Sequence, residues 1–381
     1  MNARERYVRA LLFLGPDRVP LSPGAPREST LAAWRQQGLP EGADYRSCLL
    51  DLLGVEPEPW QPKVDLGVDL RMIPWFEEKV LEHHPAAPGR PGSYVVQDWM
   101  GAITEISDEY DYTYIRTAKD FVTRKWHRFP VASRADWLRM RERYDPAAPG
   151  RYPEDLAFRL ECLQAREHPL IVTANGPFWQ LREWLGLEGL CLAMVEQPAW
   201  VEEMIDYWTE FVLAVLGPVV ARIQIDALRI SEDMAYKAHS MISPAMARRF
   251  LLPTYRKWSS AVGAAGCPIV DVDSDGYVAE LIPVWLDGGV NVCDPVEVAA
   301  GNDVVEYRRR FGRSMGYVGA IDKRAIARGG REMEAEVLRV VPPLLEEGGF
   351  VPSCDHGVPP DISWPAYVEY SRLLAKLTGW L

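Results

Sequence analysis

Residues 269–276 have the sequence IVDVDSDG, a short β-branched run that ends in acidic residues. Five more short apolar runs lie between residue 169 and the end of the chain, and amphipathic, helix-like stretches separate them. These five runs begin at Leu170, Ala227, Val290, Tyr317 and Phe350. Strands that alternate with helices in this way are typical of βαβ units and of a parallel sheet. The sequence therefore predicts an α/β fold for this part of the chain.

Two further strands would close these six into a barrel. Six parallel strands fit either an open doubly wound sheet or most of a closed barrel. We expect a seventh strand at residues 18–21, after an opening helix, and an eighth between about residues 64 and 106. With these two strands the fold class would be α/β, a (β/α)8 TIM barrel, whereas six or seven strands would equally fit an open doubly wound sheet.

Residues from about 61 to 153 interrupt the predicted alternation of strands and helices. This segment is rich in aromatic residues, contains alternating stretches at 94–99 and 112–116, and ends in a polar, proline-rich connection. It has no Gly/Ser linker of the kind that separates independent domains. We therefore expect a single domain over residues 1–381, with a β-rich insertion that caps the barrel mouth.

The composition is that of an ordinary globular protein with an acidic surface. The chain has 381 residues, a formal net charge of −12 and a pI near 5.1. An acidic surface repels nucleic acid and anionic membranes, so we expect neither as a partner. The apolar stretches are too short to span a bilayer and no signal-type segment follows Met1, which predicts a cytoplasmic protein. The six cysteines form no CxxC pair, as expected of reduced thiols.

A polar or acidic residue follows each predicted strand. These residues are Asn175, Glu232, Asp233, Asp273, Asp275, Asp294, Asp322, Cys354, Asp355 and His356. The carboxyl ends of barrel strands meet on one face, so we expect these side chains to surround a single pocket. An aspartate in this position also commonly caps the following helix. Helix capping alone does not explain why Glu232 stands beside Asp233, or why two aspartates flank Ser274.

Two kinds of site are consistent with such a cluster. The first is a metal centre, because Asp, His and Cys are metal ligands and the pairs Asp273/Asp275 and Cys354/His356 each place two of them at one strand end. The second is a set of acid/base groups for a polar substrate, because crowded carboxylates raise each other's pKa. The residues alone leave both interpretations open.

The order of several short motifs resembles that of the uroporphyrinogen decarboxylase superfamily. The motifs are RER (4–6), DRVP (17–20), NGPF (175–178), SED (231–233), DG (275–276), LIP (281–283), GVNV (289–292) and HGVPP (356–360). The resemblance spans nearly the whole chain and implies a (β/α)8 barrel, often a homodimer, with its active site in the cleft at the strand ends. The superfamily contains true decarboxylases and also zinc-dependent methyltransferases that exchange methyl groups with corrinoid proteins.

Departures from the superfamily's motifs separate these branches. True decarboxylases carry a Met-Arg-Gln-Ala-Gly-Arg segment after the first strand, whose arginines bind the substrate's carboxylates, but residues 21–27 here retain only Arg27. The thiol-directed methyltransferases carry His-x-Cys-Gly after the fifth strand and Cys-Gly near the last. This chain has DSDG at 273–276 and HG at 356–357. The resemblance thus implies a metal site rebuilt with oxygen and imidazole ligands, suited to Lewis-acid activation of a methoxy oxygen.

We therefore expect an enzyme, a methyltransferase that moves a methyl group from a methylated small molecule, such as a methoxylated aromatic, to a corrinoid protein or a related acceptor. Zinc is the expected metal and the corrinoid is expected on a partner protein. The expected catalytic residues are Glu232, Asp233, Asp273 and His356, the expected metal ligands are Asp273, Asp275, Cys354 and His356, and Asn175 and Asp294 are expected to bind the cofactor.

Two alternatives remain at this stage. One is a metal-independent decarboxylase, acting on a uroporphyrinogen or a smaller carboxylated substrate, with Asp233 and His356 as proton donor or stabiliser of the intermediate. The other is a corrinoid- or tetrapyrrole-binding protein without turnover. Chelation should leave the decarboxylase fully active, and an Asp233→Asn substitution should leave ligand binding by the non-enzymatic protein unchanged.

Overall fold

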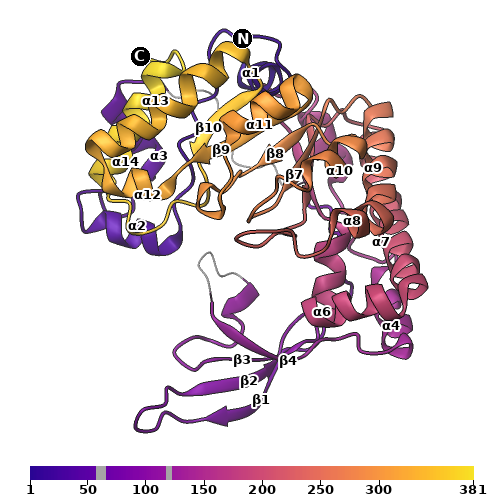
Figure 1. Cartoon of the computed structure of the whole chain (residues 1–381). Coiled ribbons are helices and arrows are strands. Elements are labelled where there is room, and N and C mark those ends of the chain that lie inside the picture. Colours follow the sequence, from indigo (N-terminus) through magenta and orange to yellow (C-terminus); the bar gives the residue numbers. More distant parts are fainter. Residues whose placement is uncertain (57–65, 117–121) are drawn as a thin grey trace. The chain divides into compact units, whose positions relative to one another are not determined.

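The computed structural model describes residues 1–56, 66–116 and 122–381, and the chain divides into two compact units (Figure 1). Unit 1 consists of Met1–Leu66, Ala157–Gly176 and Pro218–Leu381. Unit 2 consists of Gly67–Leu156 and Pro177–Gly217. No helix among the residues described is both long and apolar enough to cross a membrane.

The described residues form the following strands and helices. The strands are β1 (Lys79–His84), β2 (Ser93–Gln97), β3 (Ile103–Ser107), β4 (Arg124–Arg128), β5 (Ile171–Asn175), β6 (Ala227–Ser231), β7 (Ile269–Asp273), β8 (Val292–Asp294), β9 (Gly316–Ile321) and β10 (Phe350–Cys354). The α-helices are α1 (Ala3–Leu11), α2 (Glu28–Arg35), α3 (Tyr45–Leu53), α4 (Arg134–Arg141), α5 (Leu156–Cys162), α6 (Pro177–Glu196), α7 (Pro198–Val220), α8 (Pro244–Phe250), α9 (Leu252–Ala264), α10 (Ile282–Asp287), α11 (Val304–Phe311), α12 (Lys323–Arg328), α13 (Gly330–Glu347) and α14 (Trp364–Leu377). Short 3-10 helices are η1 (Tyr114–Arg116), η2 (Glu142–Tyr144), η3 (Val298–Ala300) and η4 (Gly312–Ser314).

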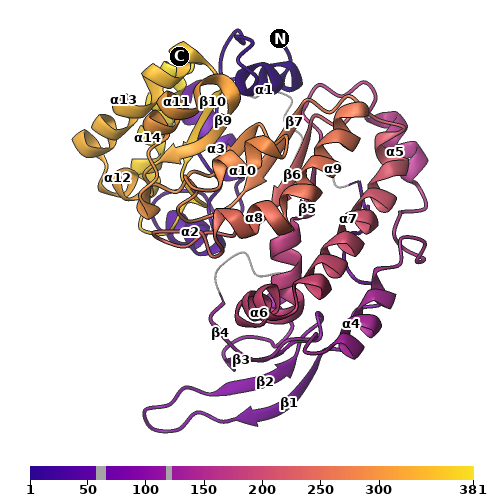
Figure 2. The same cartoon turned by 45° about the vertical axis from the view of Figure 1, so that its right-hand side comes forward.

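Unit 1 is built on a six-stranded parallel sheet in the order β10-β9-β8-β7-β6-β5. Each strand lies beside the one that follows it in the sequence, and helices connect consecutive strands, as the alternating pattern predicts. Figure 1 shows α12, α13 and α14 next to β9 and β10. Figure 2 shows α9 and α10 beside the part of the sheet that contains β6 and β7. The six predicted strands are thus confirmed.

One face of this sheet changes from apolar to ionic along the strands. At the beginning of the strands, a buried apolar cluster packs against α1; it includes Ala10, Leu11, Ala227, Ile269, Val292 and Val351. Two positions further along β6, β7 and β8 come Arg229, Asp271 and Asp294. Side chains two residues apart share a face of a sheet, so the charged residues stand directly above the apolar floor. The charged layer is therefore held at the carboxyl ends of the strands.

The expected seventh and eighth strands differ from the prediction. Residues 18–21 form no strand, although the extended chain that follows them runs beside the end of β10, where Cys354 donates its backbone N–H to the carbonyl of Pro23. Prolines at 20, 23 and 26 lack the N–H that a strand needs, which explains the missing ladder. In the region 64–106, the described strands β1, β2 and β3 belong to a separate antiparallel sheet, and residues 57–65 lie outside the described residues.

Unit 2 contains the β-rich insertion that the sequence predicts. Its sheet has the order β1-β2-β3-β4, and all neighbouring strands are antiparallel. The stretch 94–99 falls largely on β2, whereas 112–116 ends in the 3-10 helix η1 instead of a strand. Helices α4 and α6 and most of α7 complete this unit. That the insertion caps the barrel mouth within a single domain stays a prediction.

Candidate active site

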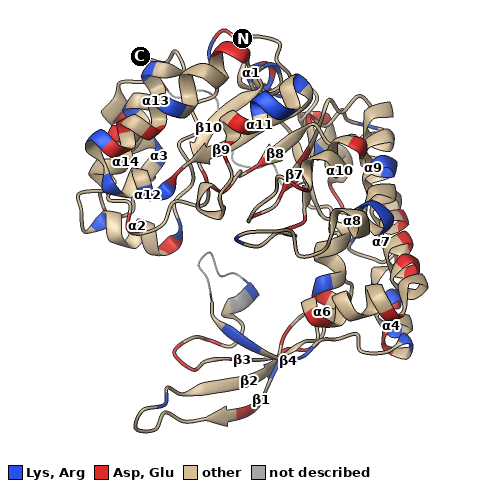
Figure 3. Cartoon of the chain, viewed as in Figure 1, with Lys and Arg blue, Asp and Glu red and all other residues tan. Residues whose placement is uncertain are grey.

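The centre of the candidate site is Arg229 of β6. Its Nε donates to Asp271 Oδ2 on β7 at 2.7 Å, and its Nη2 lies 2.6 Å from Asp294 Oδ2 on β8. The parallel register places Arg229 directly opposite Asp271, and Asp273 opposite Asp294. Figure 3 shows the acidic residues gathered on β7, β8 and the loops after them. One guanidinium group therefore faces carboxyl groups from two neighbouring strands.

The cluster contains more carboxyl groups than Arg229 can neutralise. Burial raises the pKa of Asp273 well above its ordinary value, and the negative charge of Asp294 raises it further. The pKa of Asp271 is raised too, mainly by burial, although Arg229 acts in the opposite direction. Asp273 makes no side-chain hydrogen bond within the described ranges, whereas Asp271 and Asp294 both pair with Arg229. Asp273 is therefore the carboxyl group that most readily holds a proton near neutral pH.

The cluster is open to solvent on one side only. The side chain of Asp271 is 1% exposed, while those of Arg229 and Asp294 are 19% and 15% exposed. Asp273 is also partly exposed. From the apolar floor, Tyr7 of α1 approaches the same group: burial raises the pKa of its phenol, and the charge of Asp271 adds to this rise. A ligand can thus reach Asp273 and Asp294, but not the far side of Asp271.

A second pair of predicted residues meets at the ends of β7 and β10. His356 Nε2 lies 3.0 Å from Asp275 Oδ2, and Arg27 Nη2 lies 3.1 Å from His356 Nδ1. The hydrogen bond to Asp275 raises the pKa of His356, which favours the doubly protonated ring. Arg27 is only a donor, so its contact requires a lone pair on Nδ1 and hence the neutral ring. The imidazole is thus held between two neighbours that favour opposite protonation states.

Asp355, the residue before His356, holds neighbouring loops together. It is fully buried, and its carboxylate accepts the backbone N–H groups of Lys323 at 3.0 Å and Val298 at 2.8 Å. Burial nevertheless outweighs these bonds and raises the pKa of Asp355 to about 6. Lys323 Nζ in turn pairs with Glu297 Oε1 at 2.8 Å. These contacts tie the loop after β8 to the loop after β9, so the strand ends are fixed in place.

The expected metal ligands do not converge. Within the described part of the chain, no three His, Cys, Asp or Glu side chains are arranged to hold a metal ion. Cys354 is buried, and its Cβ lies against Gly24, whose carbonyl accepts the Tyr367 hydroxyl of α14 at 2.6 Å. It stands three positions after Val351 of the apolar floor, so it faces the helix side of the sheet. Burial raises the pKa of its thiol to about 12, which disfavours the thiolate that binds zinc. These residues therefore do not fit the expected zinc site.

Glu232 also lies away from the open side of the cluster. It is fully buried, and the Tyr255 hydroxyl of α9 donates to its Oε1 at 2.5 Å. A Cβ on Gly176 would lie 2.1 Å from Glu232 Cδ, so only glycine leaves room for this carboxyl group after β5. Glu232 thus holds the end of the sheet to α9.

Asn175, at the end of β5, and Asp233, in the turn after β6, lie at the same edge of the sheet. Asn175 ends β5 opposite Ser231, and the Asp233 backbone N–H donates to the carbonyl of Asp273 at 3.4 Å. Asp233 has a left-handed φ of 41°, a conformation that costs about 1 kcal/mol outside glycine. Both residues lie at the strand ends, as the sequence predicts.

Comparison with known proteins bears on this geometry. Residues 141–367, more than half of the chain, match the family Uroporphyrinogen decarboxylase (URO-D). The chain belongs to the URO-D family. A structure described as a methyltransferase from Methanosarcina mazei matches with a TM-score of 0.55 and 15% sequence identity, covering 100% of this chain and 98% of the other. No curated protein matches the chain.

Membership of the URO-D family accounts for the architecture of unit 1. Together with the fold shared with the Methanosarcina mazei structure, it identifies the six parallel strands as part of a (β/α)8 barrel, which confirms the predicted fold class. All six strands lie within the matched residues 141–367. The charged cluster is therefore at the face where TIM-barrel enzymes carry their active sites.

Sequence reasoning about this URO-D member missed Arg229 and Asp271. Both lie inside the apolar runs and not after them, so a search for polar residues after each strand does not select them. The available signal was a charged residue inside a buried run, at the third position of ALRI and of IVDV. A buried charge must be paired, and two neighbouring strands with opposite charges at matching positions supply such a pair.

Proposed function

We propose that this URO-D family enzyme is a methyltransferase that removes a methyl group from a methylated small molecule, such as a methoxylated aromatic. A corrinoid protein or a related acceptor supplied by a partner would take the methyl group. The observation that carries the proposal is the surplus of carboxyl groups around Arg229, which leaves the partly exposed Asp273 as a proton donor.

The proton is what such a reaction requires from the protein. When a nucleophilic acceptor attacks the methyl carbon of an aryl methyl ether, the carbon–oxygen bond breaks and its electron pair goes to the oxygen. An acid that protonates this oxygen converts a poor leaving group into a neutral phenol. Asp273 would donate the proton and become a carboxylate, which Arg229 stabilises, and a proton from water would restore it.

The charge balance at the strand ends disfavours a substrate with many carboxylates. Arg229 is already paired with Asp271 and Asp294, and Lys323 with Glu297. A polycarboxylate needs cationic partners, and placing it beside Asp273 and Asp275 would add repulsion. A neutral or weakly charged methylated substrate avoids this cost. Because the expected zinc ligands do not converge, the proposed chemistry uses acid–base groups only.

Decarboxylation is the second candidate, and one observation favours it. The guanidinium of Arg27, whose Nη2 lies 3.1 Å from His356 Nδ1, places one positive charge near the strand ends, which suits a single carboxylate. In this reaction the bond to the carboxylate carbon breaks, carbon dioxide leaves, and Asp273 protonates the remaining carbon. The candidate substrate is therefore a small monocarboxylate and not a porphyrinogen.

The test follows both products in parallel. The enzyme is incubated with methoxylated aromatics or methylamines and chemically reduced cobalamin, and methylcobalamin is measured by its absorbance. The proposal expects methylation with the wild type and a loss of about 100-fold with Asp273→Asn, the lower end for removal of a general acid. Carbon dioxide release from small carboxylic acids, without methylation, would establish the second candidate instead.

A matched control is Asp322→Asn. Asp322 also follows a barrel strand, but its carboxylate caps α12 and pairs with Arg324, away from Arg229. Asparagine caps helices about as well as aspartate, so this variant should keep its fold and activity. Equal losses in both variants would contradict a specific role for Asp273.

A further inference from the structure

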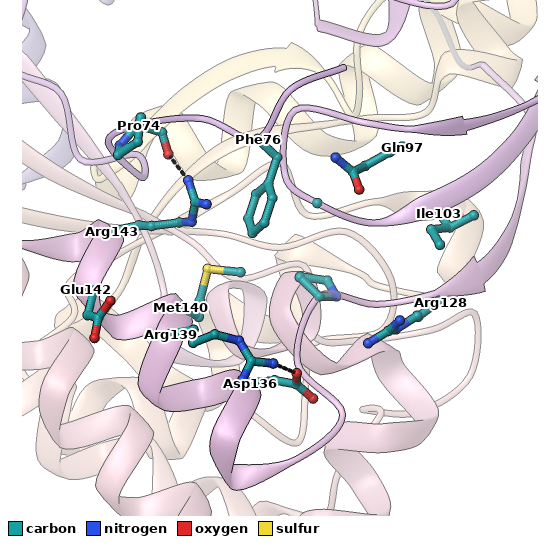
Figure 4. A pocket seen from close by; sticks show the side chains of 12 residues that line it. Pro74, Phe76, Gln97, Ile103, Arg128, Asp136, Arg139, Met140, Glu142 and Arg143 are labelled. Carbon is teal, nitrogen blue, oxygen red and sulfur yellow. Dashed lines mark hydrogen bonds and ion pairs between the residues drawn. The ribbon is translucent and has the colours of Figure 1, made fainter. Parts of the chain in front are cut away.

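Unit 2 contains a pocket that the proposed reaction does not use. Its volume is about 480 Å³, within the usual range for sites that hold small molecules. Residues from β2, β3, β4, α4, η2 and the loops before β1 and after β2 and β4 line it: Pro74, Phe76, Gln97, Gly101, Ile103, Arg128, Pro130, Asp136, Arg139, Met140, Glu142 and Arg143 (Figure 4). All of these residues belong to unit 2, so the pocket is complete within that unit.

The apolar part of this pocket is fixed by the backbone. The Phe76 N–H donates to the carbonyl of Trp99 at 3.0 Å, which holds the phenylalanine beside the turn after β2. Gly101 in that turn has a φ of 87°, and a Cβ there would lie 2.7 Å from the Phe76 ring. Only glycine therefore lets the ring lie in this position. Met140 of α4, which is buried, and Phe76 give the pocket a flat, apolar wall.

The charged part of the pocket contains three arginines and two acidic residues, Asp136 and Glu142. Among the described residues, no carboxylate forms a direct ion pair with Arg143 or Arg128, although Arg128 is near enough to lower the pKa of Asp136; Arg139 pairs with Asp136 directly. The Arg143 guanidinium lies 3.8 Å from the Phe76 ring centre, and its Nη1 donates to the Pro74 carbonyl at 2.6 Å. These contacts orient the guanidinium and leave its remaining N–H groups available.

The two cations flank the apolar wall. Figure 4 shows Phe76 and Met140 between Arg143 on one side and Arg128 on the other. Gln97 uses its Nε2 to donate to the carbonyl of Glu77, so its amide oxygen adds an acceptor to the lining. A flat ring against Phe76 and Met140 would present a carboxylate to the fixed guanidinium of Arg143, with Arg128 adding long-range attraction.

We propose that this pocket of unit 2 binds a small aromatic monocarboxylate, with Phe76 and Met140 against the ring and Arg143 as the anchor of the carboxylate. The inference is independent of the reaction proposed for unit 1. It identifies a binding site whose occupant carries both a flat apolar surface and one negative charge.

The test measures the binding of benzoate, which has no methyl group to transfer, to the full chain by isothermal titration calorimetry. Benzene, which lacks the carboxylate, and acetate and inorganic phosphate, which lack the ring, should each bind at least about tenfold more weakly. Arg143→Gln should weaken binding by about tenfold, and Arg128→Gln by about threefold because it acts at longer range. Arg139→Gln is the matched control, because Arg139 is already paired with Asp136. This variant should bind with a dissociation constant within about twofold of the wild-type value.

A filling substitution tests the site without removing charge. Ile103→Trp places a large ring in the pocket from β3 and should abolish binding, while an unchanged circular dichroism spectrum shows that the sheet persists. Wild-type binding by Ile103→Trp, or by both Arg143→Gln and Arg128→Gln, would overturn the proposal. So would equal binding of phosphate and benzoate, or no binding of benzoate to the wild type.

Discussion

Substitution of Arg229 by methionine tests the charged cluster most sharply. Methionine has a similar length and no charge, so the change removes one guanidinium and leaves Asp271 and Asp294 without their partner. Breaking a buried ion pair by removing one member typically costs about 3–5 kcal/mol, because the remaining charge stays buried. Asp271 is 1% exposed, so water cannot replace the lost cation there.

The size of this loss should depend on pH, and its sign follows from the carboxyl groups. Burial already raises the pKa of Asp271, and without Arg229 it rises further. Between the unfolded pKa of about 3.9 and this higher folded value, the folded state binds more protons than the unfolded state. The free energy of unfolding then falls with rising pH by about 1.4 kcal/mol per pH unit for each such proton. We therefore expect the variant to lose about 1 kcal/mol at pH 5 and about 3–5 kcal/mol at pH 8.

Urea unfolding at the two pH values, followed by tryptophan fluorescence, measures these losses. A matched control is Arg324→Gln: Arg324 pairs with Asp322 but is 53% exposed, so the loss should stay below about 1 kcal/mol at both pH values. Adding Asp271→Asn to the Arg229→Met variant should recover most of the stability at pH 8. An equal loss at pH 5 and pH 8, or no recovery in the double variant, would refute the proposed charge balance.

Three further predictions concern the proton donor and its surroundings. Asp273 must be protonated to act as an acid, so activity should fall as the pH increases through its raised pKa. Asp273→Asn should abolish this fall. A variant whose activity falls over the same pH range as the wild type would contradict the role of Asp273. Gly176→Ala should lower the free energy of unfolding by about 1–3 kcal/mol, because the new Cβ would overlap the buried Glu232 carboxyl group. A free energy of unfolding equal to that of the wild type, measured by thermal unfolding, would contradict this. Cys354→Ser should leave the metal content measured by mass spectrometry unchanged, since the thiol lies on the helix side of the sheet, and a loss of metal would disprove that placement.

Much of the fold could be predicted from the sequence because its signal is local. Each apolar run from residue 170 onward is a strand of unit 1, and the alternating stretch 94–99 marks β2 of the insertion. The missing strands could not be placed in the same way. Residues 18–26 are extended but contain three prolines, and whether such a segment pairs depends on its distant neighbour β10.

The candidate site was harder to predict because it depends on which face of a strand each side chain occupies. Adjacent residues on a strand point to opposite faces, so Cys354, three positions after Val351 of the apolar floor, packs on the helix side of the sheet. His356 lies beyond the end of β10, in a bend where this alternation no longer applies, and meets Asp275. Sequence proximity to a strand end therefore overestimates the number of residues that share one pocket. Arg27 is the one arginine that residues 21–27 keep from the decarboxylase motif, and the structure places it against His356.

The most direct test of the account is the protonation state of Asp273 in the folded enzyme. Protein labelled with ¹³C at the aspartate carboxyl groups can be titrated and observed by NMR, with Asp273→Asn used to assign the resonance. The account predicts a resonance that titrates well above the ordinary aspartate pKa of about 3.9 and is absent from the variant. A resonance of Asp273 that titrates at the ordinary value would show that the carboxyl group is ionised at neutral pH, and would remove the proton donor from the proposed reaction.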